Sequence, residues 1–331
     1  MIQPRADPHD VISIYIHQNG ETTRASAIDQ AWLEPASSVT LWVDVVSPGE
    51  DERRILSDVF HFHPLAVEDA LTAIHHPKIE PYGHYLYLIL HGIDFQQDEH
   101  WFATRDVDFF LGRNYLVTVH DGHSRSIEAL KALCEQHDHI LDEGPVALMH
   151  RIVDSMVDNY RPEIEGLEDD IDRLEDEAIL SRHENLIRDI LALKRDLGSL
   201  RRVVIPQRDA VARLARREFP QINDEMAFRF RDVHDNLVRL SDESILLHDR
   251  VTGILEAHLS AISNRLNRVM KVLTVMSTIF LPLTVLTGMW GMNVPLPHFP
   301  GGEDVQFWWV TGCMAAIAGV MLALFRRNEW L

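Results

Sequence analysis

The chain has 331 residues, 46% of them apolar and 25% charged, a composition that excludes wholesale disorder and collagen-like repeats. It contains 51 acidic and 31 basic residues, so its formal net charge is −20. So large an acidic excess argues against nucleic acid as a partner and favours cations. The two cysteines, Cys134 and Cys313, are too few for a disulfide framework, which is typical of protein facing a reducing compartment.

The first part of the chain, residues 1–145, alternates strand-like runs with helical ones. Ser47, followed by Pro48 and an acidic turn, is typical of a helix start, and residues 64–74 predict a second helix. Runs rich in β-branched and aromatic residues predict strands at residues 11–17, 39–46, 85–93, 107–112 and 114–120. We therefore expect a cytosolic α/β domain.

From residue 146 the pattern becomes helical. Residues 146–220 predict two antiparallel acidic helices, and nine carboxylates between Glu163 and Glu177 are offset by Arg173 alone. Such a surface is either a solvated face or one that attracts divalent cations or a basic partner. Residues 221–290 predict one stalk helix ~100 Å long. A helix of that length needs neighbours to be stable, which favours an oligomer.

Two uncharged apolar runs, residues 272–290 and 305–325, each have the length that a helix needs to cross a bilayer. The connecting loop, residues 291–304, contains no Lys or Arg, and the outer flanks are basic: Arg265, Arg268 and Lys271 before the first run, and Arg326 and Arg327 in the tail 326–331. The positive-inside rule then predicts that both termini are cytosolic.

Small and polar residues recur at seven-residue spacing along the first span. The two rows are Asn267, Thr274, Leu281 and Gly288, and Met270, Ser277, Thr284 and Gly291. Such a seam is typical of helix–helix contact in lipid, or of a pore that several subunits share. Neither span contains an ionisable side chain, which argues against a proton relay.

The span ends in Gly291-Met292-Asn293, followed by a short Pro- and Gly-rich loop. Here the sequence resembles the CorA family of divalent-cation channels, whose hallmark is Gly-Met-Asn at this position. The similarity runs from residue 264 to the basic tail, and more loosely over residues 66–90. The chain departs from the family at Trp290, where Tyr is usual, and in the sequence of the external loop. The resemblance implies a homopentamer in the bacterial inner membrane, with a peripheral second span.

The resemblance also implies roles for individual residues. Gly291, Met292 and Asn293 would form the selectivity filter, and Glu303 and Asp304 would concentrate cations outside. Seven residues fall where the family lines its pore, with Met270 and Leu273 as an apolar gate: Asn267, Met270, Leu273, Ser277, Leu281, Thr284 and Gly288. A regulatory Mg²⁺ would bind between Asp232 and an acid of the neighbouring subunit's Glu68–Asp69 pair.

The function that follows is uptake of Mg²⁺, and also of Co²⁺ or Ni²⁺, driven by the membrane potential and gated by cytosolic Mg²⁺. The alternative is a Zn²⁺ transporter of the ZntB type, with or without proton coupling, for which Cys134, His137 and His139 are candidate ligands. Met292 in the signature favours Mg²⁺. A membrane-anchored sensor or enzyme is a further alternative. The sequence contains no phosphate-binding Gly loop, nucleophile elbow or His-Glu-x-x-His motif, and we expect no enzymatic activity.

Overall fold

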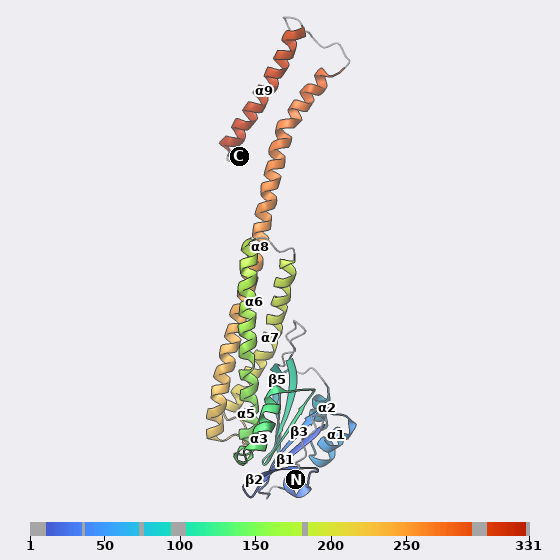
Figure 1. Ribbon diagram of the computed structural model, residues 1–331, viewed down its shortest axis with the longest axis vertical. Helices are drawn as coiled ribbons and strands as arrows, with labels where there is room; N and C mark the ends of the chain where they lie inside the picture. Colours follow the sequence, from blue (N-terminus) through green and yellow to red (C-terminus); the bar gives the residue numbers. More distant parts are fainter. Residues whose placement is uncertain are drawn as a thin grey trace. The chain divides into compact units, whose positions relative to one another are not determined.

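Figure 1 shows the chain as a computed structural model, which describes residues 11–34, 37–72, 76–93, 104–180, 185–292 and 303–328. The chain divides into two compact units, Met1–Ile254 and Leu255–Leu331. Helix α8 (Asp224–Trp290) begins in the first unit and ends in the second. The expected fold class, an α/β domain followed by a long helix and two apolar helical segments, is confirmed.

The first unit contains a seven-stranded sheet in the order β2-β1-β3-β7-β6-β5-β4. Strands β3 and β7 are parallel, and the other neighbouring pairs are antiparallel. The strands are β1 (Ile12–Gln18), β2 (Glu21–Ala25), β3 (Thr40–Val46), β4 (Lys78–Tyr82), β5 (Tyr85–Ile93), β6 (Thr104–Leu111) and β7 (Tyr115–His120). The central strands are nearly continuous apolar runs because both faces of the sheet are covered.

Helical segments cover the two faces. On one face lie α1 (Glu50–Arg54), the π-helical turn η2 (Ile55–Val59) and α2 (Pro64–Leu71), which enclose an aromatic core. Within it, the rings of Phe62 and Phe110 stack at 4.2 Å between centroids. Helices of the other face follow β7 in the chain: α3 (Arg125–Gln136), α4 (His139–Asp142) and α5 (Pro145–Asp158).

The first helix starts later than its sequence predicts. The N-cap is Gly49, not Ser47, and the Gly49 N–H donates to the Glu52 carboxylate at 2.8 Å, which satisfies one backbone donor at the start of the helix. Ser47 instead adopts a left-handed conformation (φ 49°) at the end of β3. There its hydroxyl accepts a hydrogen bond from the Gly122 N–H at 3.1 Å. The short 3₁₀ turn η1 (Gln30–Leu33) precedes β3.

Long helices complete the first unit. Helices α6 (Tyr160–Leu180) and α7 (Leu186–Ala215) pack against each other, and the first part of α8 runs beside them (Figure 1). Buried residues on α8 alternate spacings of four and three, which is the coiled-coil pattern. The residues in this pattern are Met226, Phe230, Val233, Leu237, Leu240, Ser244, Leu247, Val251 and Ile254, and Ala227 and Ser241 are buried beside them.

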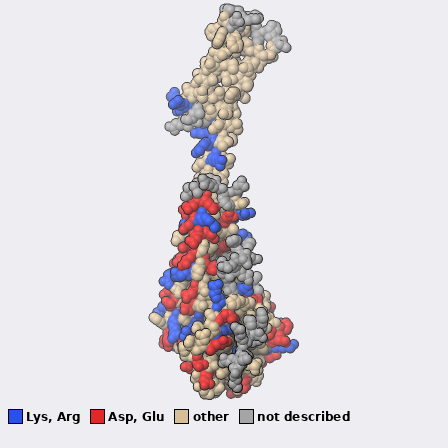
Figure 2. Space-filling model, viewed as in Figure 1, with Lys and Arg blue, Asp and Glu red and all other residues tan. Residues whose placement is uncertain are grey.

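The second unit contains the end of α8 and helix α9 (Glu303–Arg327). Both are long and apolar enough to cross a membrane, with a mean hydropathy of 1.9 in each span. Figure 2 shows this unit as almost entirely uncharged, with basic side chains gathered at one end. This arrangement matches the expectation of two spans with basic flanks.

Candidate ion-conduction face and regulatory site

Within the second unit, one side of α8 is turned toward α9. Val275 is buried, and Ile279, Pro282 and Leu286 on the same side are partly buried. Since successive residues are rotated by ~100° around a helix, Ser277 and Thr284 lie about 180° from this side. All seven candidate pore-lining residues are exposed: Asn267, Met270, Leu273, Ser277, Leu281, Thr284 and Gly288. Helix α8 therefore carries an uncovered face opposite α9, and the seam predicted from the sequence lies on it.

The polar groups of this part of α8 are compatible with an apolar environment. The Thr284 hydroxyl donates to the Leu281 carbonyl at 2.8 Å, and the Thr287 hydroxyl donates to the Leu283 carbonyl at 3.1 Å. Each hydroxyl thus satisfies its donor within its own helix and still has lone pairs to offer. The face can accept hydrogen bonds from water without exposing a charge.

The helix ends at the signature. The Gly291 N–H donates to the Thr287 carbonyl at 2.8 Å, and a Cβ at Gly291 would lie 3.1 Å from that oxygen. A side chain at this position would therefore crowd the last turn. Asn293, the third signature residue, lies outside the described residues. Glu303 and Asp304 are the first two residues of α9.

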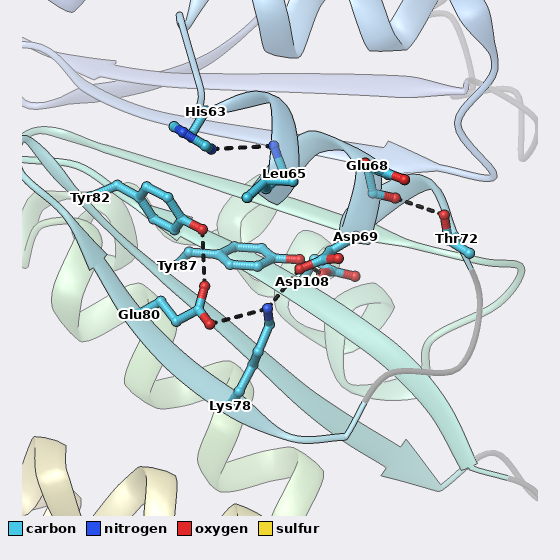
Figure 3. Close-up of polar contacts among 10 residues, drawn as sticks. All are labelled: His63, Leu65, Glu68, Asp69, Thr72, Lys78, Glu80, Tyr82, Tyr87 and Asp108. Carbon is cyan, nitrogen blue, oxygen red and sulfur yellow. Dashed lines mark hydrogen bonds and ion pairs between the residues drawn. The ribbon is translucent and has the colours of Figure 1, made fainter.

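Figure 3 shows the surroundings of the Glu68–Asp69 pair on α2. Lys78 of β4 lies between two carboxylates, with its Nζ 2.6 Å from Asp69 Oδ2 and 3.3 Å from Glu80 Oε1. Burial acts to lower the pKa of Lys78, but its hydrogen bonds to Asp69 and Glu80 outweigh this effect and raise the pKa. Asp69 is therefore charge-compensated inside its own chain. Glu68 is exposed, and its backbone carbonyl accepts the Thr72 hydroxyl at 2.8 Å.

Beneath this pair lies a buried carboxyl group that the sequence did not reveal. Asp108 of β6 is 5% exposed and accepts a hydrogen bond from the Tyr87 hydroxyl at 2.5 Å. Burial raises the pKa of Asp108 to about 7, although the Tyr87 hydrogen bond opposes the change. The negative charges of Asp106 and Asp69 raise this pKa further.

Asp232 is exposed on α8, within electrostatic reach of carboxylates on α5. Burial raises the pKa of Asp154, and the negative charges of Asp158 and Asp232 raise it further, against the influence of His150. These acids form a cluster that sequence reasoning missed, although the four-residue spacing of Asp154 and Asp158 on one helix face could have indicated it. Among the described residues, no three His, Cys, Asp or Glu side chains gather closely enough to hold a metal ion.

The candidate zinc ligands are not brought together either. Cys134 is buried in α3, and burial raises the pKa of its thiol to about 12, so the thiol stays protonated. The rings of His137 and His139 lie 5.6 Å apart between centroids. The described part of the chain therefore does not form this three-residue set.

Further exposed carboxylates on α8 extend the spacing of the seam. Counting back from Met270 in steps of seven reaches Ser263 and then four acids: Glu256, Asp249, Asp242 and Asp235. All four are exposed. This row lies outside the span, so a seven-residue count that is confined to the span does not reach it. Continuing the same count toward the N-terminus would have found it.

Comparisons with known proteins identify the family. The sequence profile of the family described as "CorA-like Mg2+ transporter protein" matches residues 37–327. The cobalt/magnesium transport protein CorA of Thermotoga maritima is 29% identical over 300 residues, which cover 89% of this chain and 84% of that protein. The zinc transport protein ZntB of Yersinia enterocolitica is 26% identical over 271 residues, which cover 81% of each chain.

The fold is shared along nearly the whole chain. The complete structure of the CorA magnesium transporter from Methanocaldococcus jannaschii superposes with a TM-score of 0.79 at 22% identity, covering 98% of this chain and 99% of that one. The Bacillus subtilis protein YfjQ is 32% identical over 292 residues, which cover 87% of this chain and 89% of that protein. The chain therefore belongs to the CorA family of divalent metal cation transporters, and it is a transporter rather than an enzyme.

Proposed function

We propose that the chain is one subunit of a homopentameric Mg²⁺ channel in a bacterial inner membrane, with both termini in the cytosol. The observation that carries the proposal is the uncovered, uncharged face of α8 opposite α9. Two spans cannot enclose a pore, so copies of this face must surround it. The subunit number of five rests on the CorA resemblance.

A neutral face suits a hydrated divalent cation. Mg²⁺ prefers oxygen ligands and loses its water reluctantly. The Ser277 and Thr284 hydroxyls and the amide of Asn293 would accept hydrogen bonds from the ion's water shell without binding it too tightly for release. At ~2.3 kcal/mol per charge per 100 mV, the membrane potential supplies ~4.6 kcal/mol for a divalent ion. No coupling ion is then required.

A row of acids on α8 supports flow of cations toward the cytosol. It consists of Asp235, Asp242, Asp249 and Glu256. These acids are exposed on α8: Asp235, Asp242 and Asp249 belong to the first unit, and Glu256 follows it, before the basic flank of the span. In a bundle of several α8 helices they would form rings of carboxylates that hold cations leaving the pore on the cytosolic side.

Gating would follow from carboxylates that meet between subunits. Because Lys78 compensates Asp69, Glu68 is the acid that we assign as the partner of Asp232 in the neighbouring subunit. Their repulsion opens the assembly, and Mg²⁺ bound between them screens the repulsion and favours the closed state. Co²⁺ and Ni²⁺ would use the same oxygen ligands.

Ion flux into proteoliposomes at zero pH gradient tests the proposal. We expect Mg²⁺ entry to increase with an inside-negative potential, to disappear in Asn293→Ala and to persist in Asn328→Ala, which removes an amide just beyond α9. Similarity to ZntB keeps Zn²⁺ transport as the competing function. Zn²⁺ entry that needs a proton gradient, with Mg²⁺ excluded, would assign the chain to that function.

A further inference from the structure

Helix α7 presents a basic face away from the body of the first unit. Its cations follow two rows at seven-residue spacing: Arg188, Arg195 and Arg202, and Lys194, Arg201 and Arg208. Between the rows runs a strip of apolar and small residues that includes Leu191, which is 50% exposed, and Gly198, where an added Cβ would meet no neighbour. This basic face has the form of a docking surface for another helix, flanked by positive charge on both sides.

Helix α6 presents the complementary acidic face, which Figure 2 shows as a band of Asp and Glu side chains on the first unit. It consists of six exposed acids: Glu165, Glu168, Asp169, Asp172, Glu175 and Asp176. Arg250 of α8 contacts two of them, lying 2.7 Å from Asp172 and 2.8 Å from Glu175. The other four form no ion pair within the described residues.

Part of the basic face is occupied by contacts within α7. Arg188 and Arg208 of the basic face pair with Asp189 and Asp209 of α7 itself, at 3.8 and 3.0 Å. The two faces lie on different sides of the helix pair, because each is the side that its helix does not bury. A contact between them therefore needs two copies of the chain.

We propose that in the assembled oligomer the basic face of α7 in one subunit binds the acidic face of α6 in the next subunit. The inference rests on the oligomer of the proposed function and names one of its contacts. Like charges oppose α7–α7 and α6–α6 pairing, so two-fold association through these faces is disfavoured. The remaining contact joins two different surfaces, and contacts of that type close into rings.

The positions of the charges along the helix axes agree with such a ring. Glu165 lies about four turns before the end of α6, and Arg201 lies about four turns after the start of α7. In a ring whose axis runs along these helices, neighbouring subunits sit at equal height, so Glu165 of one faces Arg201 and Arg202 of the next. Asp172 and Lys194 match in the same way.

Mixed cross-linking in the full-length protein tests the contact. Subunits carrying Glu165→Cys and differently tagged subunits carrying Arg201→Cys, both with Cys134→Ala and Cys313→Ala, are co-expressed and oxidised in membranes. We expect a disulfide between the two kinds of subunit and none in samples that contain one kind alone. A disulfide between two Arg201→Cys subunits, or no mixed disulfide in an intact oligomer, would overturn the inference.

Charge reversal provides the second measurement. Arg201→Glu with Arg202→Glu is expected to lower, by roughly threefold, the salt concentration at which the oligomer dissociates in detergent. Adding Glu165→Lys and Asp169→Lys should restore it, whereas Arg113→Glu, in the turn between β6 and β7, should leave it unchanged. Failure of the swap to restore stability counts against this contact alone. Absence of Mg²⁺ flux through the uncross-linked wild-type ring counts against the proposed function alone, and a monomeric wild type counts against both.

Discussion

Replacing Asp108 with asparagine tests whether a buried acid in the sheet sets the pH dependence of stability. The pKa of Asp108 is raised to about 7 in the folded protein, against 3.8 for an unperturbed aspartate. Each tenfold change in proton affinity corresponds to ~1.36 kcal/mol. Keeping Asp108 ionised in the folded protein at pH 8 therefore costs about 4 kcal/mol relative to the unfolded chain.

The sign follows from the protons bound. Between about pH 4 and pH 7 the folded protein holds a proton on Asp108 that the unfolded chain releases. The free energy of unfolding therefore falls as the pH rises through this range, and is lowest above pH 7. Asp108→Asn removes this dependence and retains an oxygen that can accept the Tyr87 hydrogen bond.

The test is the Tm of the full chain in detergent, measured from pH 5 to pH 8. At ~2–4 °C per kcal/mol for a unit of this size, Asp108→Asn should raise the Tm at pH 8 by ~8–16 °C and change it much less at pH 5. Asp58→Asn, which alters an exposed aspartate on η2, should have little effect at either pH. A Tm gain that is equal at both pH values, or a loss at pH 8, would refute the reasoning.

Two further predictions concern ion flux. Glu68→Gln should raise the cytosolic Mg²⁺ concentration that closes the channel by about tenfold, which corresponds to ~1.4 kcal/mol of lost binding energy. The control, Glu50→Gln on α1, should leave this concentration unchanged. Unchanged closure in Glu68→Gln would exclude Glu68 as a ligand. Thr284→Asp places a ring of full charges on a neutral face, so Mg²⁺ should bind there tightly and its flux should fall at least about tenfold. The control, Thr311→Asp on α9, should lower the flux less. Equal effects of the two substitutions would argue against a pore along α8.

The spans and the central strands could be predicted from the sequence because their patterns are local. Uninterrupted apolar runs identified the spans, and runs rich in β-branched and aromatic residues identified β1, β3, β5, β6 and β7. The two strands that were missed, β2 and β4, are the two edges of the sheet. Edge strands are half-covered, so β2 reads as the polar sequence ETTRA and β4 contains Pro81, both poor strand signals.

The candidate regulatory site could be predicted only in part, because charge compensation is not local. The sequence presents Glu68 and Asp69 as equivalent acids, and only the return of the chain through β4 places Lys78 beside Asp69. The sequence alone does not distinguish Asp108 from other strand residues, because its hydrogen-bond partner Tyr87 lies on a different strand, β5. That the candidate pore-lining residues share one side of α8 was easier to predict, because residues spaced by seven along a helix lie on the same side.

The net charge of −20 is therefore a poor guide to where cations act. Acids inside the sheet domain have partners from their own chain: Asp44 is fully buried, yet Lys131 lies 2.7 Å from it and His120 3.3 Å, and its pKa is lowered. Acids on the outer sides of α6 and α8 largely lack such partners within the described residues. Dissolved cations screen the repulsion among these acids, and in the proposed oligomer the cations of a neighbouring subunit would do so as well. In the proposed channel, these acids, rather than the total charge, are thus the positions at which assembly and Mg²⁺ concentration would be coupled.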